Sequence, residues 1–299
     1  MVERLLTELN YRPGTQTGLS KPYYLIKNQK MEYNKKYYND VWTRILSKYS
    51  VDSPVRDLGD VSRAYHVGKY LEKTIRLCKS KEKVVIHDYG AGNWLYLGEI
   101  LRVLKLFKQQ KFILVGNDFS QEALDFGIEK YRKQIPANVE IQTRSGDFAK
   151  HLYDTETGSV DIVISLETLE HVYEDEKIFS ELVRILVLDG FLIVSVPTKQ
   201  PFWLSKNWFL YVLANKRFTE KDRIVGHLRR YTTKTFSDLN KGRLSRLDGS
   251  FYGFLLSDYL KDILKVFREG SMAHEFIFNL AKRLLLVEDG FFNYLGIKR

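Results

Sequence analysis

Short apolar runs that alternate with amphipathic stretches constrain the fold of this chain more than any other sequence feature. Five such runs occupy residues 84–89, 112–118, 139–145, 160–166 and 191–197. The stretches between them, including SQEALDFGIEKYRKQ and DEKIFSELVRILV, space their apolar residues as helices do. Alternation of strands and helices predicts a mostly parallel α/β sheet with helices on both faces.

Local signals refine this prediction. Ser120, with Glu122 in the following turn, resembles a helix N-cap, and the sequence LDG at 188–190 predicts a turn before the fifth strand. Beyond Pro197, TTKTFSDLNKG is expected to form a helix capped by Thr232 or Thr233. RLSRLDG and FFNYLGIK are candidates for a sixth and a seventh strand.

Composition narrows the class of protein. The single cysteine, Cys78, excludes an internal disulfide and any multi-cysteine metal site. The N-terminus lacks the apolar region of a secretory signal, and the longest apolar runs are too short to span a bilayer. We therefore expect a cytoplasmic protein, either soluble or peripherally bound to a membrane.

Positive charge is concentrated in one part of the chain. The formal net charge is +10, and residues 199–246 hold twelve lysines and arginines against three acids. This segment suits an anionic partner such as a phosphorylated metabolite, RNA or an acidic lipid surface, and a solvated basic face is the alternative.

Acidic residues follow three successive predicted strands. HDYGAGNW places Asp88 before Gly90 and Gly92, which allow a tight turn and close approach of a ligand. Asp118 ends the second run, where an acid can accept hydrogen bonds from ribose hydroxyls, and Asp147 follows the third run. Turn formation alone does not explain three acids at three strand ends.

These motifs resemble those of the class I S-adenosylmethionine-dependent methyltransferases. HDYGAGN is similar to the glycine-rich first motif, LVGNDFSQEAL to the second, SGDF to the third, and VDIVISLETLEHV with ELVRILVLDGFLIVSVPT to the later elements. GHLRRYT at 226–232 resembles a segment of the subgroup that includes ubiquinone-biosynthesis methyltransferases. A nicotinamide-binding fold is the main rival, but its fingerprint requires a glycine where Leu95 stands.

The resemblance implies a Rossmann-like seven-stranded sheet and S-adenosylmethionine as the cofactor. Its implied cofactor-binding residues are Asp88, Gly90, Gly92, Asp118, Phe119, Asp147, Phe148 and Leu166. The pattern along the chain, taken with this resemblance, predicts three parts: an N-terminal helical cap (1–80), the cofactor-binding core (81–200), and a basic aromatic insertion with the acceptor pocket and remaining core elements (201–299). Trp94 departs from the family pattern, which often has a third glycine there, so we expect a reshaped loop or weaker cofactor binding.

The catalytic candidates lie after the fourth run, in the sequence E-x-x-E-H. If the segment is helical, Glu167, Glu170 and His171 share one face, and His227 is a possible fourth partner. Some quinone-precursor O-methyltransferases and small-RNA 2′-O-methyltransferases hold Mg²⁺ with two Glu and two His residues, which these positions resemble. In many other relatives the Glu and His residues only shape the pocket, and both alternatives remain open, with His171, Glu170 and His227 as the catalytic candidates.

Two aromatic segments bear on the acceptor. Residues 201–218 mix tryptophan, phenylalanine and tyrosine with basic residues, and residues 250–267 form a second amphipathic stretch. They suit a substrate lid, an interfacial helix, a platform for unpaired bases, or simple packing against the sheet. We expect methylation of a hydroxyl on a small, partly apolar or anionic metabolite, lipid or quinone-like. An RNA 2′-O-methyltransferase and a non-catalytic binding protein are the alternatives.

Overall fold

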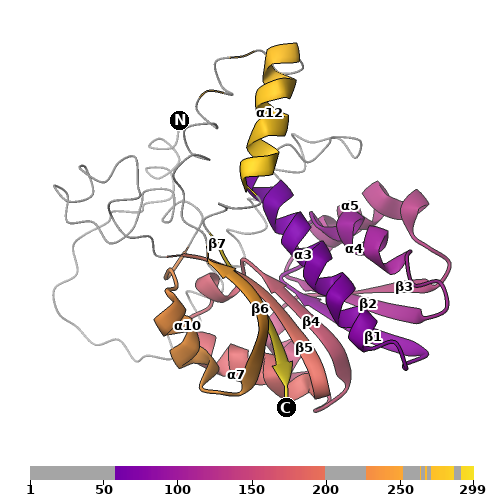
Figure 1. Cartoon of the computed structure of the whole chain (residues 1–299). Helices are drawn as coiled ribbons and strands as arrows, with labels where there is room; N and C mark the ends of the chain where they lie inside the picture. The colour runs from indigo at the N-terminus through magenta and orange to yellow at the C-terminus, as the bar shows by residue number, and fades with distance from the viewer. Residues whose placement is uncertain (1–57, 199–226, 252–262, 264–266, 268–270, 286–290) are drawn as a thin grey trace, which may run out of the picture. The chain divides into compact units, whose positions relative to one another are not determined.

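The computed structural model describes residues 58–198, 227–251, 263, 267, 271–285 and 291–299 of the chain. Its centre is a seven-stranded sheet in the order β3-β2-β1-β4-β5-β7-β6 (Figure 1). β1 to β5 run parallel, and β7 runs antiparallel to both β5 and β6. The predicted Rossmann-like α/β fold is confirmed, including its sixth and seventh strands.

The strands match the apolar runs of the sequence closely. They are β1 (Lys83–Tyr89), β2 (Lys111–Asp118), β3 (Val139–Ser145), β4 (Val160–Leu166), β5 (Leu186–Pro197), β6 (Leu244–Phe251) and β7 (Phe291–Lys298). Every residue of β4 is buried, because helices cover both faces of a central parallel strand.

The helices flank this sheet. The described helices are α3 (Leu58–Leu77), α4 (Leu97–Leu104), α5 (Gln121–Tyr131), α6 (Phe148–Asp154), α7 (Asp175–Ile185), α10 (Thr233–Asn240) and α12 (Met272–Leu285), with the short 3-10 helices η1 (Arg132–Gln134) and η2 (Leu169–His171). Ser120 caps α5 and Thr232 caps α10, as predicted, each by accepting a backbone hydrogen bond. None of the described helices is long and apolar enough to cross a membrane.

Two hydrophobic clusters hold the layers together, one on each face of the sheet. The first joins α3 and α4 to residues such as Ile86, Ile164 and Ile193 of the strands. The second joins α6, α7 and α10 to strand residues on the other face, including Val163 and Val194. Alternate residues of each strand therefore enter opposite clusters, as strand geometry requires.

The predicted turn at 188–190 is wrong, because these residues lie inside β5. Val160 of β4 pairs with Leu186, whereas Ile162 pairs with Phe191, so β5 has extra residues at this point. Asp189 adopts a φ of 60° there. The turn-forming residues thus form a bulge that the strand passes through.

The N-terminal part of the chain is described only from residue 58 onward. There α3 confirms the predicted helical character of DVSRAYHVGKYLEKTIRLC. The predicted insertion at 201–218 and most of the amphipathic stretch 250–267 lie outside the described residues. The division into parts at residues 80 and 200 stays a prediction.

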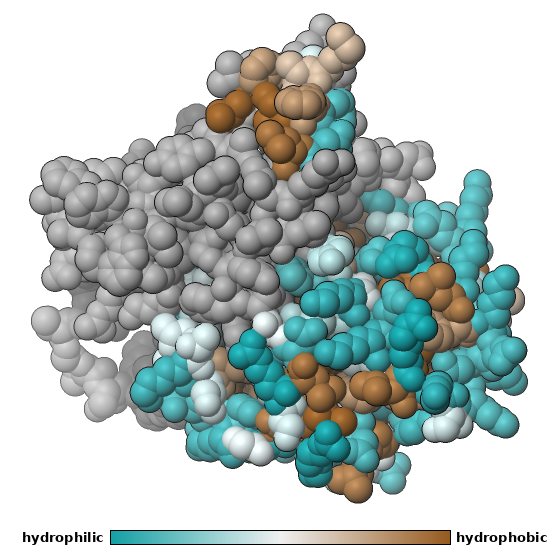
Figure 2. Space-filling model, viewed as in Figure 1, coloured by the Kyte–Doolittle hydropathy of each residue, from teal (hydrophilic) through white to brown (hydrophobic). Residues whose placement is uncertain are grey.

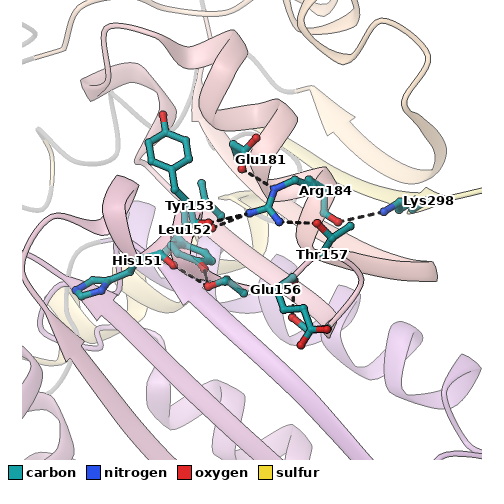
Figure 3. A network of polar contacts seen from close by, with 11 residues as sticks. His151, Leu152, Tyr153, Glu156, Thr157, Glu181, Arg184 and Lys298 are labelled. Atoms are coloured by element: carbon teal, nitrogen blue, oxygen red, sulfur yellow. Dashed lines mark hydrogen bonds and ion pairs between the residues drawn. The ribbon is translucent and has the colours of Figure 1, made fainter.

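Arg184 organises a polar network at the amino edge of the sheet, where β4 and β5 begin (Figure 3). Its guanidinium donates to Glu181 (2.6 Å), to the Thr157 hydroxyl (2.7 Å) and to the Leu152 carbonyl (3.0 Å). The Lys298 ammonium donates to the carbonyls of Arg184 and Leu186, at 3.3 and 2.7 Å. The network therefore ties the end of α7 to the loop before β4 and to the last strand.

Candidate active site at the carboxyl edge of the sheet

The glycine-rich loop after β1 is held between β2 and the segment that follows β4. Gly90 and Gly92 have φ values of 85° and 55°, in the left-handed region that favours glycine. The Gly90 and Ala91 N–H groups both donate to the Asn117 carbonyl, at 2.9 and 3.1 Å. A Cβ on Gly90 would lie 2.2 Å from the Thr168 hydroxyl, so only glycine fits there.

Trp94 lies in the hydrophobic core. Its side chain is 1% exposed, and its backbone adopts a left-handed φ of 54°. A Cβ added to Gly116 of β2 would lie 2.1 Å from the indole, and one added to Gly127 of α5 would lie 2.5 Å from the Trp94 Cβ. The indole therefore fills the space beside Gly116, Gly127 lets α5 approach the backbone of the loop, and the loop keeps its left-handed turn without a third glycine.

Asp118 joins the end of β2 to the glycine-rich loop. Its carboxylate accepts from the Gly92 N–H (2.9 Å) and from the Ser120 N–H (3.1 Å). Burial raises the pKa of Asp118, and these backbone donors oppose the rise. The ribose contact predicted for this residue stays a prediction, and the structure gives Asp118 a role in shaping the loop as well.

Asp88, at the end of β1 and before the glycine-rich loop, is buried, with 5% of its surface exposed. Burial, together with the nearby Asp118 charge, raises its pKa to about 7. A cationic group bound beside these two carboxylates would favour their ionised forms. The pair is therefore suited to a positively charged ligand.

The SGDF motif after β3 provides a helix cap, Asp147, and an aromatic side chain, Phe148. Asp147 caps α6 by accepting from the Ala149 N–H at 2.9 Å. The Phe148 ring lies 6.0 Å from that of Phe119, in an edge-to-face arrangement, and 6.5 Å from that of Tyr89. The structure thus brings Phe119, Phe148 and the buried Leu166 to the same edge as the glycine-rich loop, where the sequence predicted the cofactor.

A second group of polar side chains forms after β4 from Glu170, His171 and His227. Their ligand atoms lie within 4.8 Å of one another. Glu170 Oε1 is 4.0 Å from His171 Nε2 and 3.8 Å from His227 Nε2, and the two imidazole rings are 4.9 Å apart in an edge-to-face arrangement. We call these three residues the Glu-His-His cluster.

The Glu170 carboxylate is unusual within this cluster. It is fully buried, and neither of its oxygens has a hydrogen-bond partner among the described residues. Burial, and next the charge of Glu167, raises the pKa of Glu170 well above its ordinary value. A buried carboxyl without donors requires a proton or a cation nearby.

Glu167 lies apart from the Glu-His-His cluster, against the predicted arrangement. It precedes the short helix η2 and adopts a left-handed φ of 51°, so the E-x-x-E-H segment is not one continuous helix. Its carboxylate pairs with Arg63 of α3. In this structure Glu167 is therefore not a member of the ligand group, although it lies in the same segment.

Sequence reasoning missed Arg63. Its guanidinium also donates to the Tyr96 hydroxyl at 2.8 Å, and the residue is 7% exposed. One signal could have found it: Arg63 falls on the helical stripe that includes the buried residues Val67, Tyr70 and Leu71. A charged residue on the buried face of a helix requires a partner in the fold.

The segment around His227 is attached to the edge of the sheet. Its backbone is held by Leu228 N–H to Glu170 O (2.8 Å) and by Tyr231 N–H to Pro197 O (2.9 Å). Arg229 pairs with Asp175 at 2.6 Å, and the Tyr231 hydroxyl donates to Asp175 at 2.8 Å. Arg229 and Tyr231 thus attach the segment that contains His227 to α7.

Residues 88–194 match the family model described as "Methyltransferase domain". No curated protein matches the chain.

Solved structures resemble the chain at low identity. One is a protein from Galdieria sulphuraria described as a candidate sarcosine dimethylglycine methyltransferase, at 14% identity and a TM-score of 0.48 over 77% of this chain and 83% of that one. A second is geranyl diphosphate C-methyltransferase from Streptomyces coelicolor A3(2), at 17% identity and 0.43 over 73% and 70%. A third is phosphoethanolamine N-methyltransferase 2 from Haemonchus contortus, at 16% identity and 0.43 over 76% and 52%.

The sequence match covers the glycine-rich loop, the acids that follow β1, β2 and β3, and the Glu170–His171 pair. The chain therefore carries a methyltransferase domain at residues 88–194, within its seven-stranded Rossmann-like fold.

Proposed function

We propose that the chain transfers the methyl group of S-adenosylmethionine to a hydroxyl of a small, partly apolar or anionic metabolite, lipid or quinone-like, at the Glu-His-His cluster. The observation that carries this proposal is the Glu170 carboxylate, buried without a hydrogen-bond donor beside two imidazoles. A hydroxyl must lose its proton as it attacks the methyl group, and imidazole accepts protons near neutral pH.

The position of the cluster supports this role. Thr168, two residues before Glu170, donates to the Tyr89 carbonyl at 3.1 Å and contacts the glycine-rich loop at Gly90. The cluster and the loop are thus joined by one short segment. Methyl transfer depends mainly on aligning the acceptor with the methyl group, and this segment would set that alignment.

The donor set also fits a divalent cation. Glu170, His171 and His227 would hold it, because a buried carboxylate without partners and two imidazoles supply three ligand atoms. Such an ion would lower the pKa of an acceptor hydroxyl. Two imidazoles favour a transition ion over Mg²⁺, so we propose Mn²⁺ or a similar ion as the better occupant.

A methyl-transfer assay tests the proposal. The purified chain is given radiolabelled S-adenosylmethionine with dihydroxyquinone precursors, their monohydroxy analogues and short RNAs, in Mn²⁺, in Mg²⁺ and in chelator. We expect labelling of the dihydroxy compounds, supported best by Mn²⁺ and lost in Glu170→Gln. Glu129→Gln is the matched control, because Glu129 is an exposed glutamate of α5.

Other results of this assay would favour a different function. Full activity of Glu170→Gln would overturn the proposed role of the cluster. Labelling of RNA alone, weakening steeply with salt, would favour the RNA 2′-O-methyltransferase alternative. Cofactor binding without transfer to any acceptor would favour a binding protein.

A peripheral membrane contact is a further part of the proposal. Met272, Phe276 and Leu280 of α12 form a stripe of hydrophobic residues that are 91%, 71% and 44% exposed (Figure 2). Such a stripe on a protein of net charge +10 suits an anionic lipid surface. Sedimentation with phosphatidylserine vesicles tests it: Phe276→Glu should reduce binding, and equal binding by the variant would refute it.

A further inference from the structure

We propose that Arg63 is a positioning residue that holds Glu167 away from the Glu-His-His cluster, and that breaking the Arg63–Glu167 pair lets Glu167 join the cluster as a fourth ligand. The inference rests on the proposed function, because it concerns the ion that the cluster would hold. It assigns α3, an element outside the matched domain, a direct influence on the site.

The backbone of Glu167 is fixed close to the cluster. Its N–H donates to the Ser195 carbonyl at 2.9 Å, and the Thr168 hydroxyl donates to the Leu166 carbonyl at 3.0 Å. Glu170 follows three residues later, within the same short segment. The carboxylate of Glu167 could therefore be redirected by side-chain rotation while the segment stays in place.

The two partners differ in their freedom to move. The Arg63 side chain is 8% exposed and that of Glu167 is 30% exposed. Arg63 is further held by its hydrogen bond to Tyr96, which lies just before α4. Arg63 is thus the fixed member of the pair, and Glu167 is the member with room to change position.

The charges around the Glu-His-His cluster favour movement of the Glu167 carboxylate from Arg63 toward a bound cation. The negative charge of Glu167 repels the Glu170 carboxylate, and the positive charge of Arg63 attracts it. Without a cation in the cluster, pairing with Arg63 offsets the repulsion between the two glutamates. With a divalent cation bound, a second carboxylate would be attracted to the cluster, so Arg63 and the ion compete for Glu167.

This competition predicts a specific effect on ion affinity. We would measure Mn²⁺ binding by the loss of the free-ion electron paramagnetic resonance signal, for the whole chain and four variants. Arg63→Gln should bind Mn²⁺ at least tenfold more tightly than wild type. The Arg63→Gln/Glu167→Gln double variant should return to within about threefold of wild type, since the gain requires the Glu167 carboxylate.

Two further variants serve as controls. Arg76→Gln removes an arginine of the same helix that pairs with Glu72, at 65% side-chain exposure, and should leave Mn²⁺ affinity unchanged. His227→Gln should abolish tight binding. Repeating the titrations at 0.5 M KCl separates ligation from through-space attraction, because only the latter is strongly screened.

The outcomes separate this inference from the proposed function. Wild-type binding that His227→Gln abolishes, combined with unchanged affinity in Arg63→Gln, would overturn the inference alone. No Mn²⁺ binding by any folded variant would overturn it together with the ion of the proposed function. If Arg63→Gln does not fold, Arg63→Lys decides, since a lysine has no group in the place of the Arg63 Nε, which contacts both Glu167 and Tyr96. Affinity equal to wild type would then count against the inference.

Discussion

The two edges of the sheet differ in how far their charged side chains are paired. At the amino edge, Arg184 donates to Glu181, Thr157 and the Leu152 carbonyl, and nearby Lys81 pairs with Asp161. At the carboxyl edge, Glu170 is buried with no hydrogen-bond donor in the part of the chain that the structure describes, and burial raises the pKa of Asp88. The charged groups named at the amino edge are paired with groups of opposite charge or with hydrogen-bond acceptors. Those named at the carboxyl edge need protons or bound cations to offset their burial.

The difference shows where stability and function reside in this fold. A satisfied polar network strengthens the native state, whereas a buried carboxyl without partners lowers stability and can bind a ligand. Parallel α/β sheets bind their ligands at the carboxyl ends of the strands, and the unsatisfied groups lie there. Substitutions should therefore separate by edge: those at the amino edge change stability, and those at the carboxyl edge change binding.

Trp94→Ala should be an exception to this separation and should have the largest effect on stability. Trp94 lies in the loop at the carboxyl edge but is packed in the core, so Trp94→Ala should destabilise the protein by about 3–5 kcal/mol. Denaturant unfolding measures the change, and a loss below about 1 kcal/mol would show that the indole does not fill the space beside Gly116.

Asp118→Ala should obey the rule at the carboxyl edge. Loss of its carboxylate removes the acceptor for the Gly92 and Ser120 N–H groups, and we expect S-adenosylmethionine to bind about 100-fold more weakly. Calorimetric titration measures this. Asp125→Ala, an exposed acid of α5, is the matched control and should bind normally. Unchanged affinity in Asp118→Ala would place the cofactor elsewhere.

Arg184→Met should obey the rule at the amino edge. It removes the hydrogen bonds to Glu181, Thr157 and Leu152, and should cost about 2 kcal/mol of stability, because several bonds from one charged group are lost together. Cofactor affinity at a temperature where the variant is folded should equal that of wild type. A tenfold loss of affinity at that temperature would contradict the separation of the two edges.

A different kind of expected effect is a pH dependence of stability that comes from Asp88. The pKa of Asp88 is about 7 in the folded state and 3.8 for a free side chain, so between these pH values the folded state holds a proton that the unfolded state has lost. Its contribution to stability therefore falls as pH rises from about 4 to 7, and is constant above.

Asp88→Asn should remove this slope. Midpoints of denaturant unfolding between pH 4 and 8 measure it, and the difference between variant and wild type should grow with pH up to about 7. A constant difference would show that Asp88 is ionised throughout. Saturating S-adenosylmethionine should flatten the wild-type slope, because a cationic ligand favours the ionised carboxylate.

The sequence predicts most of the sheet because its strands are defined by local patterns. Runs of buried residues such as those of β4, and N-caps such as Ser120 and Thr232, are legible within a few residues. The sequence LDG was misread because its backbone preference is real but tertiary pairing with β4 continues the strand through it. The backbone preference of LDG produces the bulge, and the pairing of β5 with β4 on both sides of it keeps the chain in one strand.

The site was less predictable because its contacts span large sequence separations. The three members of the Glu-His-His cluster were all named from the sequence, since two are adjacent and the third lies in a family-like segment. The pairing of Glu167 with Arg63 links residues of α3 and the segment after β4, and no local pattern specifies it. The roles of Arg229 and Tyr231 likewise depend on Asp175, in a different helix.

The packing of Trp94 against Gly116 links substitutions at two positions that are far apart in the sequence. A Cβ added to Gly116 would lie 2.1 Å from the indole, so a side chain at position 116 would collide with it. The indole is thus compatible with glycine at position 116, and Gly116 cannot be replaced while the tryptophan remains in this position. In evolutionary terms the two positions are epistatic. A stabilising substitution sought at either position should therefore be tested in combination with a change at the other.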